Sequence, residues 1–232
     1  MFILLWFTFC LLVYLWFVII IMIYNYDKER EMKKKFLNYS VNIIASNYDF
    51  DDIRLEEISY GLETLYLTVT KLVVIFGLAY LLGILKELVL LLLCYNLIRS
   101  TAYGLHASKS IYCLISSITL FIGGVYFSKY IATVPLVIKI VLCIISILLL
   151  LKYAPADTVK RPLINAKKRK ILKVKSCIKG IVYLILIIYF KDSVVSGYLL
   201  CGLVEAILMI HPFVYKIFSL PYDNYKRYNC GV

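Results

Sequence analysis

The chain has 232 residues, a length that suits one domain, and 62% of them are hydrophobic. Soluble globular domains contain roughly 45–50% apolar residues, so this composition excludes an ordinary soluble domain and indicates a membrane protein. The formal net charge is +12. Its basic residues are concentrated between hydrophobic segments, which is typical of cytoplasmic loops under the positive-inside rule. We therefore expect no nucleic-acid partner.

Residues 1–24 carry no charge. As a helix they are long enough to cross a hydrocarbon core of about 30 Å. A secretory signal peptide would need a basic start and a small-residue cleavage site, and this segment has neither. We predict an N-terminal transmembrane anchor over residues 1–24.

Residues 25–64 are more polar. Hydrophobic side chains recur at near-helical spacing over residues 36–44, beside basic residues such as Lys33, which predicts an amphipathic helix at an anionic inner leaflet. Acidic residues satisfy free amides at a helix start, so Asp51 predicts a second helix that begins near Ile53. We assign residues 25–64 to cytoplasmic or interfacial helices.

Further apolar blocks follow at residues 64–85, 88–98, 110–128, 130–151, 177–190 and 193–211. The block 88–98 would rise only about 16 Å as a helix, so it must extend through Lys86 and Glu87 or be re-entrant. We predict an all-α fold: a polytopic membrane bundle of about six core segments, some of which can be re-entrant, plus the N-terminal helix. The bundle occupies residues 65–212, and residues 213–232 form a cytoplasmic tail.

The basic residues also predict the sidedness of the chain. With residues 25–64 in the cytoplasm, two crossings return the chain near Arg99 and two more return it near Lys152. A basic cytoplasmic loop then covers residues 152–175, and a last hairpin leads to the cytoplasmic tail. All basic segments share one side, as the positive-inside rule requires. The count fixes sides and not the number of spans.

Residues 99–113 form a polar seam between two apolar blocks and contain His106 and Cys113. A cysteine nucleophile acts as a thiolate, with an imidazole as base and then as acid. On one continuous helix these side chains would lie about 10 Å apart, so direct contact requires a break between them. Ser108 or Ser110 can provide it as an N-cap. With Ser110 as the cap, Cys113 lies in the first turn, where free amides and the helix dipole lower a thiol pKa.

Two neighbouring residues add to this pattern, and the cysteine count limits it. Gly104 gives the backbone freedom just before His106, and Arg99 can favour the thiolate or bind a substrate carboxylate. A nearby Cys and His are by themselves a weak signal, and a Cys in an apolar run usually acts as a small hydrophobe. The odd total of seven cysteines, without short repeated spacing, argues against a disulfide framework or a metal site. We expect no cofactor.

The seam resembles the accessory gene regulator protein B family, the membrane cysteine endopeptidases of Gram-positive quorum sensing. The family pattern is an Arg, then Gly-Gly-x-His-Ala, then a Cys seven residues after the His. Here it reads Arg99, Tyr103-Gly104-Leu105-His106-Ala107 and Cys113. The resemblance spans about residues 32–190 and includes Tyr60–Glu63, Tyr153–Thr158, Arg161-Pro162 and Lys167–Lys170.

The chain departs from the family in two places. Tyr103 replaces the first glycine of the pair, which can stiffen the turn. Residues 1–31 exceed what such proteins usually carry, so either this member has an added anchor or translation begins at Met32.

The resemblance implies an enzyme that cleaves the acidic C-terminal tail from a small amphipathic pro-peptide and promotes its cyclisation to a thiolactone. The nucleophile would be Cys113 and the general base and acid His106. Supporting residues would be Arg99, Gly104 and Ser116, and substrate-binding residues Lys167, Lys168, Arg169 and Lys170. We expect a multi-pass protein of a Gram-positive cell membrane, in contact with lipid, with a cytoplasmic active site and with a homodimer as its assembly.

Two alternatives remain at this point. The bundle could export the peptide, with Lys71, Lys139 and Glu205 lining a path through the membrane. It could also be a non-catalytic membrane scaffold. His211 precedes Pro212 at the end of the last block, so we expect it to act as a helix cap or at the interface.

Overall fold

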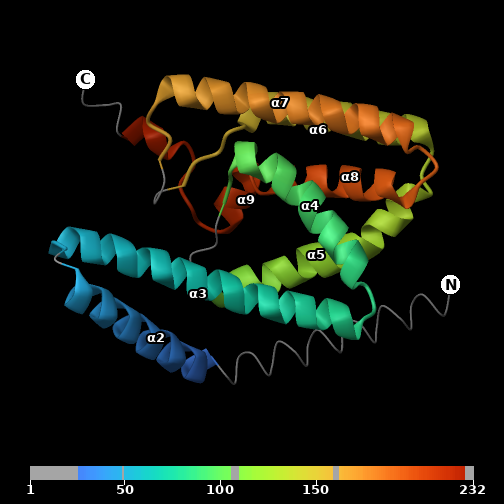
Figure 1. Cartoon of the computed structure of the whole chain (residues 1–232). Helices are drawn as coiled ribbons and strands as arrows, with labels where there is room; N and C mark the ends of the chain where they lie inside the picture. The colour runs from blue at the N-terminus through green and yellow to red at the C-terminus, as the bar shows by residue number, and fades with distance from the viewer. Residues whose placement is uncertain (1–25, 49, 106–109, 159–161, 228–232) are drawn as a thin grey trace. The chain divides into compact units, whose positions relative to one another are not determined.

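The computed structural model describes residues 26–48, 50–105, 110–158 and 162–227. The predicted anchor over residues 1–24 lies outside them, and so does His106. The described residues confirm an all-α fold and contain no strand (Figure 1). Their helices are α2 (Tyr26–Asn47), α3 (Asp52–Leu81), α4 (Leu85–Ala102), α5 (Ser110–Ala132), α6 (Leu136–Tyr153), α7 (Ala166–Tyr189), α8 (Val194–Leu208), α9 (Pro212–Ile217) and the 3-10 helix η1 (Asn224–Arg227).

The chain divides into two compact units, and α2 belongs to the first, which ends at Ile75 and also includes Lys109–Ile115. Here α2 and α3 pair through an ion pair of 2.6 Å between Lys33 Nζ and Glu63 Oε1. The α3 helix begins where the sequence predicts, because the Asp51 carboxylate accepts the backbone N–H of Arg54 at 3.1 Å. It then continues without interruption to Leu81, so the second helix predicted for the polar region and the first apolar block form one helix.

Three helices in the described part of the chain are long and apolar enough to cross a membrane. They cover Arg54–Leu81, Leu114–Ala132 and Leu136–Tyr153. The α4 helix has 18 residues and extends through Lys86 and Glu87, as the short apolar block requires, which gives it a rise of about 27 Å.

The second unit comprises Phe76–Ser108 and Ser116–Val232. In it, α4 packs against α8, α6 packs against α7, and α7 also contacts α4 and α8. The α4 and α8 backbones approach closely at Gly202, where a Cβ would lie 2.8 Å from the Tyr95 nitrogen.

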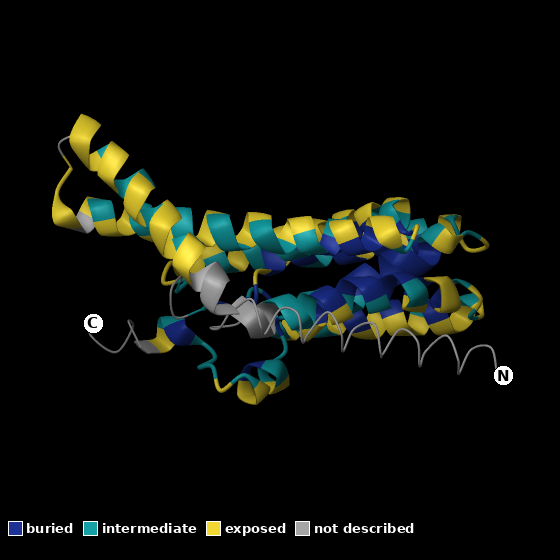
Figure 2. Cartoon of the chain, turned by 90° about the horizontal axis from the view of Figure 1, so that it is seen from below, coloured by how far each residue is buried: buried dark blue, intermediate teal, exposed yellow. Residues whose placement is uncertain are grey.

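Figure 2 shows that much of the outer helix surface is exposed. Large apolar side chains lie on it, as expected of a protein that faces lipid. Examples from the second unit are Leu93, Leu97, Val137, Leu148, Ile185 and Tyr189.

The ends of α4, α6 and α8 meet at one end of the second unit, which we call the loop end. The Gly104 N–H donates to the Ala156 carbonyl at 3.0 Å, and the Leu105 N–H donates to the Met209 carbonyl at 2.9 Å. These bonds join the segments that follow the three helices. The residues near Arg99 and Lys152 therefore belong to the same end of the unit, as the sequence count of crossings predicts.

The opposite end of the second unit contains two lysines in different environments. Lys139 is 1% exposed. Its ammonium donates to the Ala132 carbonyl at 2.8 Å, the Lys191 carbonyl at 3.1 Å and the Ser196 hydroxyl at 2.9 Å. Lys129 instead forms a surface ion pair with Glu87 at 3.1 Å. The buried ammonium thus joins the end of α5, the beginning of α6 and the residues at the beginning of α8.

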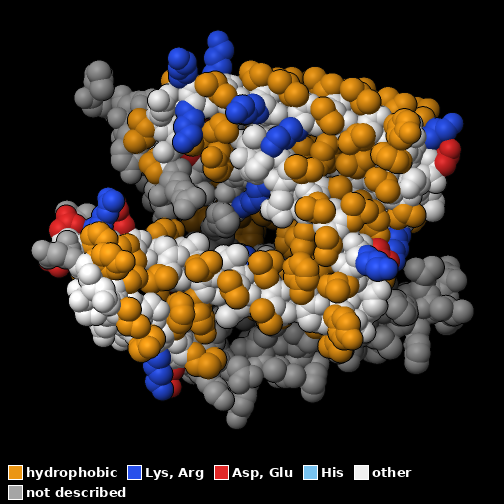
Figure 3. Space-filling view, in the orientation of Figure 1, with side chains coloured by type: hydrophobic (Ala, Val, Ile, Leu, Met, Phe, Trp, Pro, Cys, Tyr) orange, Lys and Arg blue, Asp and Glu red, His pale blue; other side chains and the backbone are white. Residues whose placement is uncertain are grey.

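The basic run after α6 is largely helical. The α7 helix begins at Ala166, with the Asn165 side chain as its cap, accepting the Lys168 N–H at 3.0 Å. The second part of the segment predicted as a basic loop, residues 166–175, thus forms the first turns of α7. Figure 3 shows Lys and Arg side chains gathered over this part of α7 and hydrophobic side chains over the rest of it.

We predict that Lys139→Met destabilises the protein by about 2 kcal/mol, because two buried carbonyls and a hydroxyl lose a charged donor. Lys129→Met is the matched control, and the loss of its surface ion pair should cost about 0–1 kcal/mol. Thermal unfolding in detergent measures both. Equal shifts in the two variants would contradict the structural role of Lys139.

Candidate functional site

The residues directly before His106 are held at the loop end by backbone hydrogen bonds. Beyond Ala102, the last residue of α4, the chain is no longer helical, and Tyr103 forms a parallel bridge with Ala156. The Ala156 N–H donates to the Ala102 carbonyl at 3.0 Å, while the Ala156 carbonyl accepts the Gly104 N–H. We call residues 103–105 the lead-in segment. It is fixed on one side by the residues after α6 and on the other by Met209 at the end of α8.

Arg99 holds the same segment from within α4. Its Nη2 donates to the Leu105 carbonyl at 2.6 Å, and its guanidinium carbon lies 5.5 Å from the centre of the Tyr95 ring. Its Nη1 is buried and has no hydrogen-bond partner among the described residues. Arg99 therefore fixes the carbonyl of the residue before His106 and keeps one N–H group for a further partner. The sequence predicted a supporting role based on its charge and did not predict the hydrogen bond to the Leu105 carbonyl.

Gly104 is required by both conformation and space. Its φ is +118°, and a Cβ would lie 2.6 Å from the Met209 carbonyl oxygen. Tyr103 also has a positive φ, of 55°, with ψ of −135°. An L-amino acid with a side chain rarely adopts such angles, whereas glycine does so readily. The geometry explains why a glycine pair suits these two positions and identifies Tyr103 as a strained replacement.

The helix that precedes His106 does not continue to Cys113. The α4 helix ends at Ala102, and α5 runs from Ser110, with Cys113 as its fourth residue. The described chain is non-helical at residues 103–105, before His106. The predicted break between His106 and Cys113, at Ser108 to Ser110, falls partly outside the described residues. The same holds for His106 and for the Cys113 side chain, so their roles stay predictions. Ser116 follows one turn later in α5 and is half-buried.

The four predicted substrate-binding residues differ in their surroundings. Lys167, Lys168 and Lys170 are exposed at the start of α7. Arg169 instead donates from Nη1 to the carbonyls of Leu163 at 2.5 Å and Ile164 at 2.8 Å. Its guanidinium also lies 3.9 Å from the centre of the Tyr225 ring. Arg169 thus stabilises the loop before α7, and the three lysines form the exposed cationic surface.

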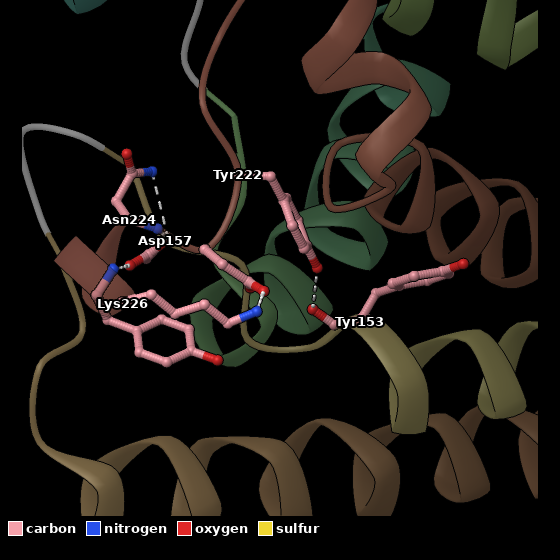
Figure 4. Close-up of polar contacts among 7 residues, drawn as sticks. Tyr153, Asp157, Tyr222, Asn224 and Lys226 are labelled. Atoms are coloured by element: carbon pink, nitrogen blue, oxygen red, sulfur yellow. Dashed lines mark hydrogen bonds and ion pairs between the residues drawn. The ribbon is translucent and has the colours of Figure 1, made fainter. Parts of the chain in front are cut away.

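Sequence reasoning missed the importance of Asp157 and of the C-terminal residues. Asp157 is 4% exposed, and its carboxylate accepts the backbone N–H groups of Asn224 at 2.9 Å and Tyr225 at 2.8 Å (Figure 4). An acidic residue directly after Ala-Pro-Ala, and several tyrosines after the last apolar block, were the available signals. Neither signal indicates a partner, because the two segments are far apart in the sequence.

Two of those tyrosines remain hydrogen-bond donors at ordinary pH. Burial raises the pKa of the Tyr215 and Tyr222 phenols well above the usual value. The Tyr215 hydroxyl donates to the Asp157 carbonyl at 3.0 Å, and the Tyr222 hydroxyl donates to the Tyr153 carbonyl at 3.3 Å. Both bonds join the C-terminal residues to the end of α6 and the segment that follows it.

His211 has the role that the sequence predicted. Its Nδ1 accepts the Phe213 N–H at 3.2 Å, which makes it the N-cap of α9. This confirms a cap at the end of the last apolar block and gives His211 a structural role.

Together these features define a class: an all-helical membrane protein whose polar residues surround a fixed non-helical segment at one end of the second unit. A family model described as Accessory gene regulator B matches residues 37–211. The chain belongs to the accessory gene regulator B family, and this membership supports a role in quorum sensing.

Similar proteins cover most of the chain. A putative AgrB-like protein of Clostridium acetobutylicum is 31% identical over 178 residues, which are 77% of this chain and 85% of that protein. A putative AgrB-like protein of Listeria innocua is 30% identical over 74% of this chain and 84% of its own length. The accessory gene regulator protein B of Staphylococcus aureus is 30% identical over 72% of this chain and 88% of its own length. No solved structure matches the chain.

We predict that Tyr103→Gly stabilises the protein by about 1 kcal/mol. It relieves backbone strain of about 1–3 kcal/mol, offset by about 0.5–1 kcal/mol of glycine chain entropy. Tyr103→Ala keeps the strain and should give no such gain. Melting temperatures in detergent compare the two variants, and a lower melting temperature for Tyr103→Gly would argue against the strained backbone.

We predict that Gly104→Ala destabilises the protein by about 1–3 kcal/mol, because the added methyl group collides with the Met209 carbonyl at an unfavourable φ. Gly123→Ala is the control, since a Cβ at Gly123 meets nothing within 4 Å. Equal melting temperatures for the two alanine variants would rule out the close approach at Gly104.

Proposed function

We propose that the protein is a membrane cysteine endopeptidase that removes the C-terminal tail of a signal pro-peptide and promotes cyclisation of the product to a thiolactone. Cys113 is the nucleophile and His106 the general base and acid. The observation that carries this proposal is the fixed lead-in segment. Two residues of the family pattern, Arg99 and Gly104, bind or shape the backbone that leads directly to a third, His106.

The first-turn position of Cys113 suits a nucleophile. The leading N–H groups of a helix have no intrahelical partner. Together with the helix dipole they favour a thiolate over a thiol. The same N–H groups can stabilise the oxyanion that forms when a thiolate attacks a carbonyl. The start of α5 therefore supplies both an activated sulfur and donors for the charge that develops next to it.

The reaction then follows from the two side chains. The His106 imidazole takes the proton of the Cys113 thiol, and the thiolate attacks the scissile carbonyl carbon. The tetrahedral intermediate collapses when the imidazolium gives its proton to the leaving amine. The C-terminal tail departs with a new amino terminus, and the rest of the substrate remains on Cys113 as a thioester.

Cyclisation completes the proposal. The neutral His106 imidazole takes the proton of a cysteine thiol within the bound substrate, and the resulting thiolate attacks the thioester carbonyl. The ring thioester forms, and Cys113 leaves as the thiolate beside the imidazolium. One thioester replaces another, so the step is nearly isoenergetic, and a site that excludes water favours it over hydrolysis. No cofactor is needed for either step.

The exposed basic residues support a cytoplasmic orientation of the loop end and a substrate with an acidic tail. The exposed Lys167, Lys168 and Lys170 lie at the start of α7, and such a cationic surface attracts an acidic peptide tail. The positive-inside rule places this basic end in the cytoplasm. An amphipathic leader on the substrate would bind the same leaflet. The unpaired Arg99 Nη1 is a further donor for a substrate carbonyl or carboxylate.

The structure gives less support to an exporter with Lys139 in its path. The Lys139 ammonium is bound to two backbone carbonyls and a hydroxyl, which accounts for its position without a transported peptide. Glu205 is 4% exposed within α8, with the Cys201 sulfur 3.5 Å from its Oε1. We therefore propose the peptidase alone.

We predict that Cys113→Ser lowers the rate of tail release by about a thousandfold or more, since the reaction loses its nucleophile. The assay uses the purified protein in liposomes with a short amphipathic peptide that carries an internal cysteine and an acidic C-terminal tail. Mass spectrometry detects the released tail and the ring.

Cys177→Ser is the matched control for this prediction. Cys177 is half-buried in α7, outside the polar seam, so its variant should retain cleavage. Undiminished tail release by Cys113→Ser would overturn the proposed function.

A further inference from the structure

One buried carboxylate connects three parts of the loop end. The Asp157 side chain accepts the Asn224 and Tyr225 N–H groups and, at 3.4 Å, the Leu163 N–H. It thus joins the segment after α6, the loop before α7 and the C-terminal residues. A buried carboxylate without such donors would be strongly unfavourable, and hydrogen bonds to a charged group are stronger than neutral ones.

The C-terminal residues 212–227, which we call the strap, contact the rest of the second unit at several points. The Tyr215 hydroxyl donates to the Asp157 carbonyl and the Tyr222 hydroxyl to the carbonyl of Tyr153, the last residue of α6. The two rings pack edge to face at 5.1 Å. Tyr225 lies beneath the Arg169 guanidinium. The family model ends at residue 211, so the strap lies beyond the part of the chain that the family pattern covers.

The strap reaches the lead-in segment through one peptide unit. Asp157 follows Ala156, and both hydrogen-bonding groups of Ala156 bind the chain around Gly104. A shift of Asp157 would shift Ala156 and with it the residues before His106. The connection runs through backbone hydrogen bonds of 3.0 Å, which tolerate little displacement.

We propose that Asp157 is a positioning residue of the peptidase and that the strap, anchored on it, fixes the lead-in segment that directly precedes His106. The inference rests on the proposed function and adds to it a part of the chain that follows the family region. Neither Asp157 nor the strap touches the reacting atoms in this account. They act through Ala156 and the lead-in segment.

The test measures the reactivity of Cys113 in the purified full-length protein. Iodoacetamide alkylation of each cysteine is followed by mass spectrometry as a function of pH. A well-placed imidazolium partner keeps the cysteine reactive at low pH. Asp157→Asn should therefore lower the alkylation rate of Cys113 about tenfold at neutral pH and move its pH profile upward by about one unit. Cleavage should fall in parallel.

Asp192→Asn is the matched control for the change of charge. Asp192 is exposed at the opposite end of the second unit, 4.0 Å from the Lys191 ammonium, and its variant should alkylate and cleave like the wild type. An unchanged Cys113 profile in a folded Asp157→Asn variant would overturn the inference, whether or not cleavage falls.

The chain contains its own reporters of folding. Cys94, Cys143 and Cys201 are 0–5% exposed, so they react only when the second unit opens. If Asp157→Asn makes these cysteines reactive, the variant is not folded, and Asn224→Ala tests the positioning role instead. It removes one side-chain donor to Asp157 at 3.4 Å and keeps the backbone N–H bond. A two- to threefold lower alkylation rate of Cys113, with the buried cysteines still unreactive, supports the positioning role. An unchanged alkylation rate of Cys113 overturns it.

The two proposals fail in different ways. Normal cleavage by Cys113→Ser removes the proposed function and the inference with it. Loss of cleavage by Cys113→Ser, together with an unchanged Cys113 profile in the deciding variant (folded Asp157→Asn, or otherwise Asn224→Ala), removes only the inference.

Discussion

The chain leaves the helical conformation at residues 103–105, and the peptide groups there need partners other than those of a helix. Buried backbone N–H and C=O groups that lack partners cost about as much as lost hydrogen bonds, and lipid offers none. Ala156 supplies one donor and one acceptor, Met209 an acceptor and Arg99 a donor. Satisfying this short segment therefore brings together the ends of α4, α6 and α8.

The same requirement explains the special residues around the segment. Gly104 allows the Met209 carbonyl to approach, and Arg99 reaches the last carbonyl before His106. Tyr103 is subject to the same constraint, because it adopts a φ of 55° that favours glycine and is therefore strained. Two residues of the family pattern, Arg99 and Gly104, thus bind or shape the backbone directly before His106.

Local signals in the sequence predicted a large part of this structure. Acidic residues before Ile53 predicted the start of α3, the short block after Lys86 predicted the extension of α4, and His211 was expected to be a cap. Each depends on residues a few positions apart. Helix periodicity and capping are local, so one sequence is enough to recognise them.

The parts that were not predicted depend on residues distant in the sequence. Asp157 binds residues 67 and 68 positions later, and nothing near it indicates a backbone partner. The same holds for Arg169, which looked like one more cation in a basic run and instead stacks on Tyr225. The helical start of α7 was missed because its basic residues were taken as a loop between apolar blocks.

The central claim is that His106 and Cys113 act as a pair, presented by the lead-in segment and by α5. The pH dependence of Cys113 alkylation, compared between the wild type and His106→Gln, tests it most directly. The account predicts that wild-type Cys113 reacts rapidly below neutral pH and that His106→Gln moves the profile upward by about one unit or more. Superimposable profiles would contradict the account.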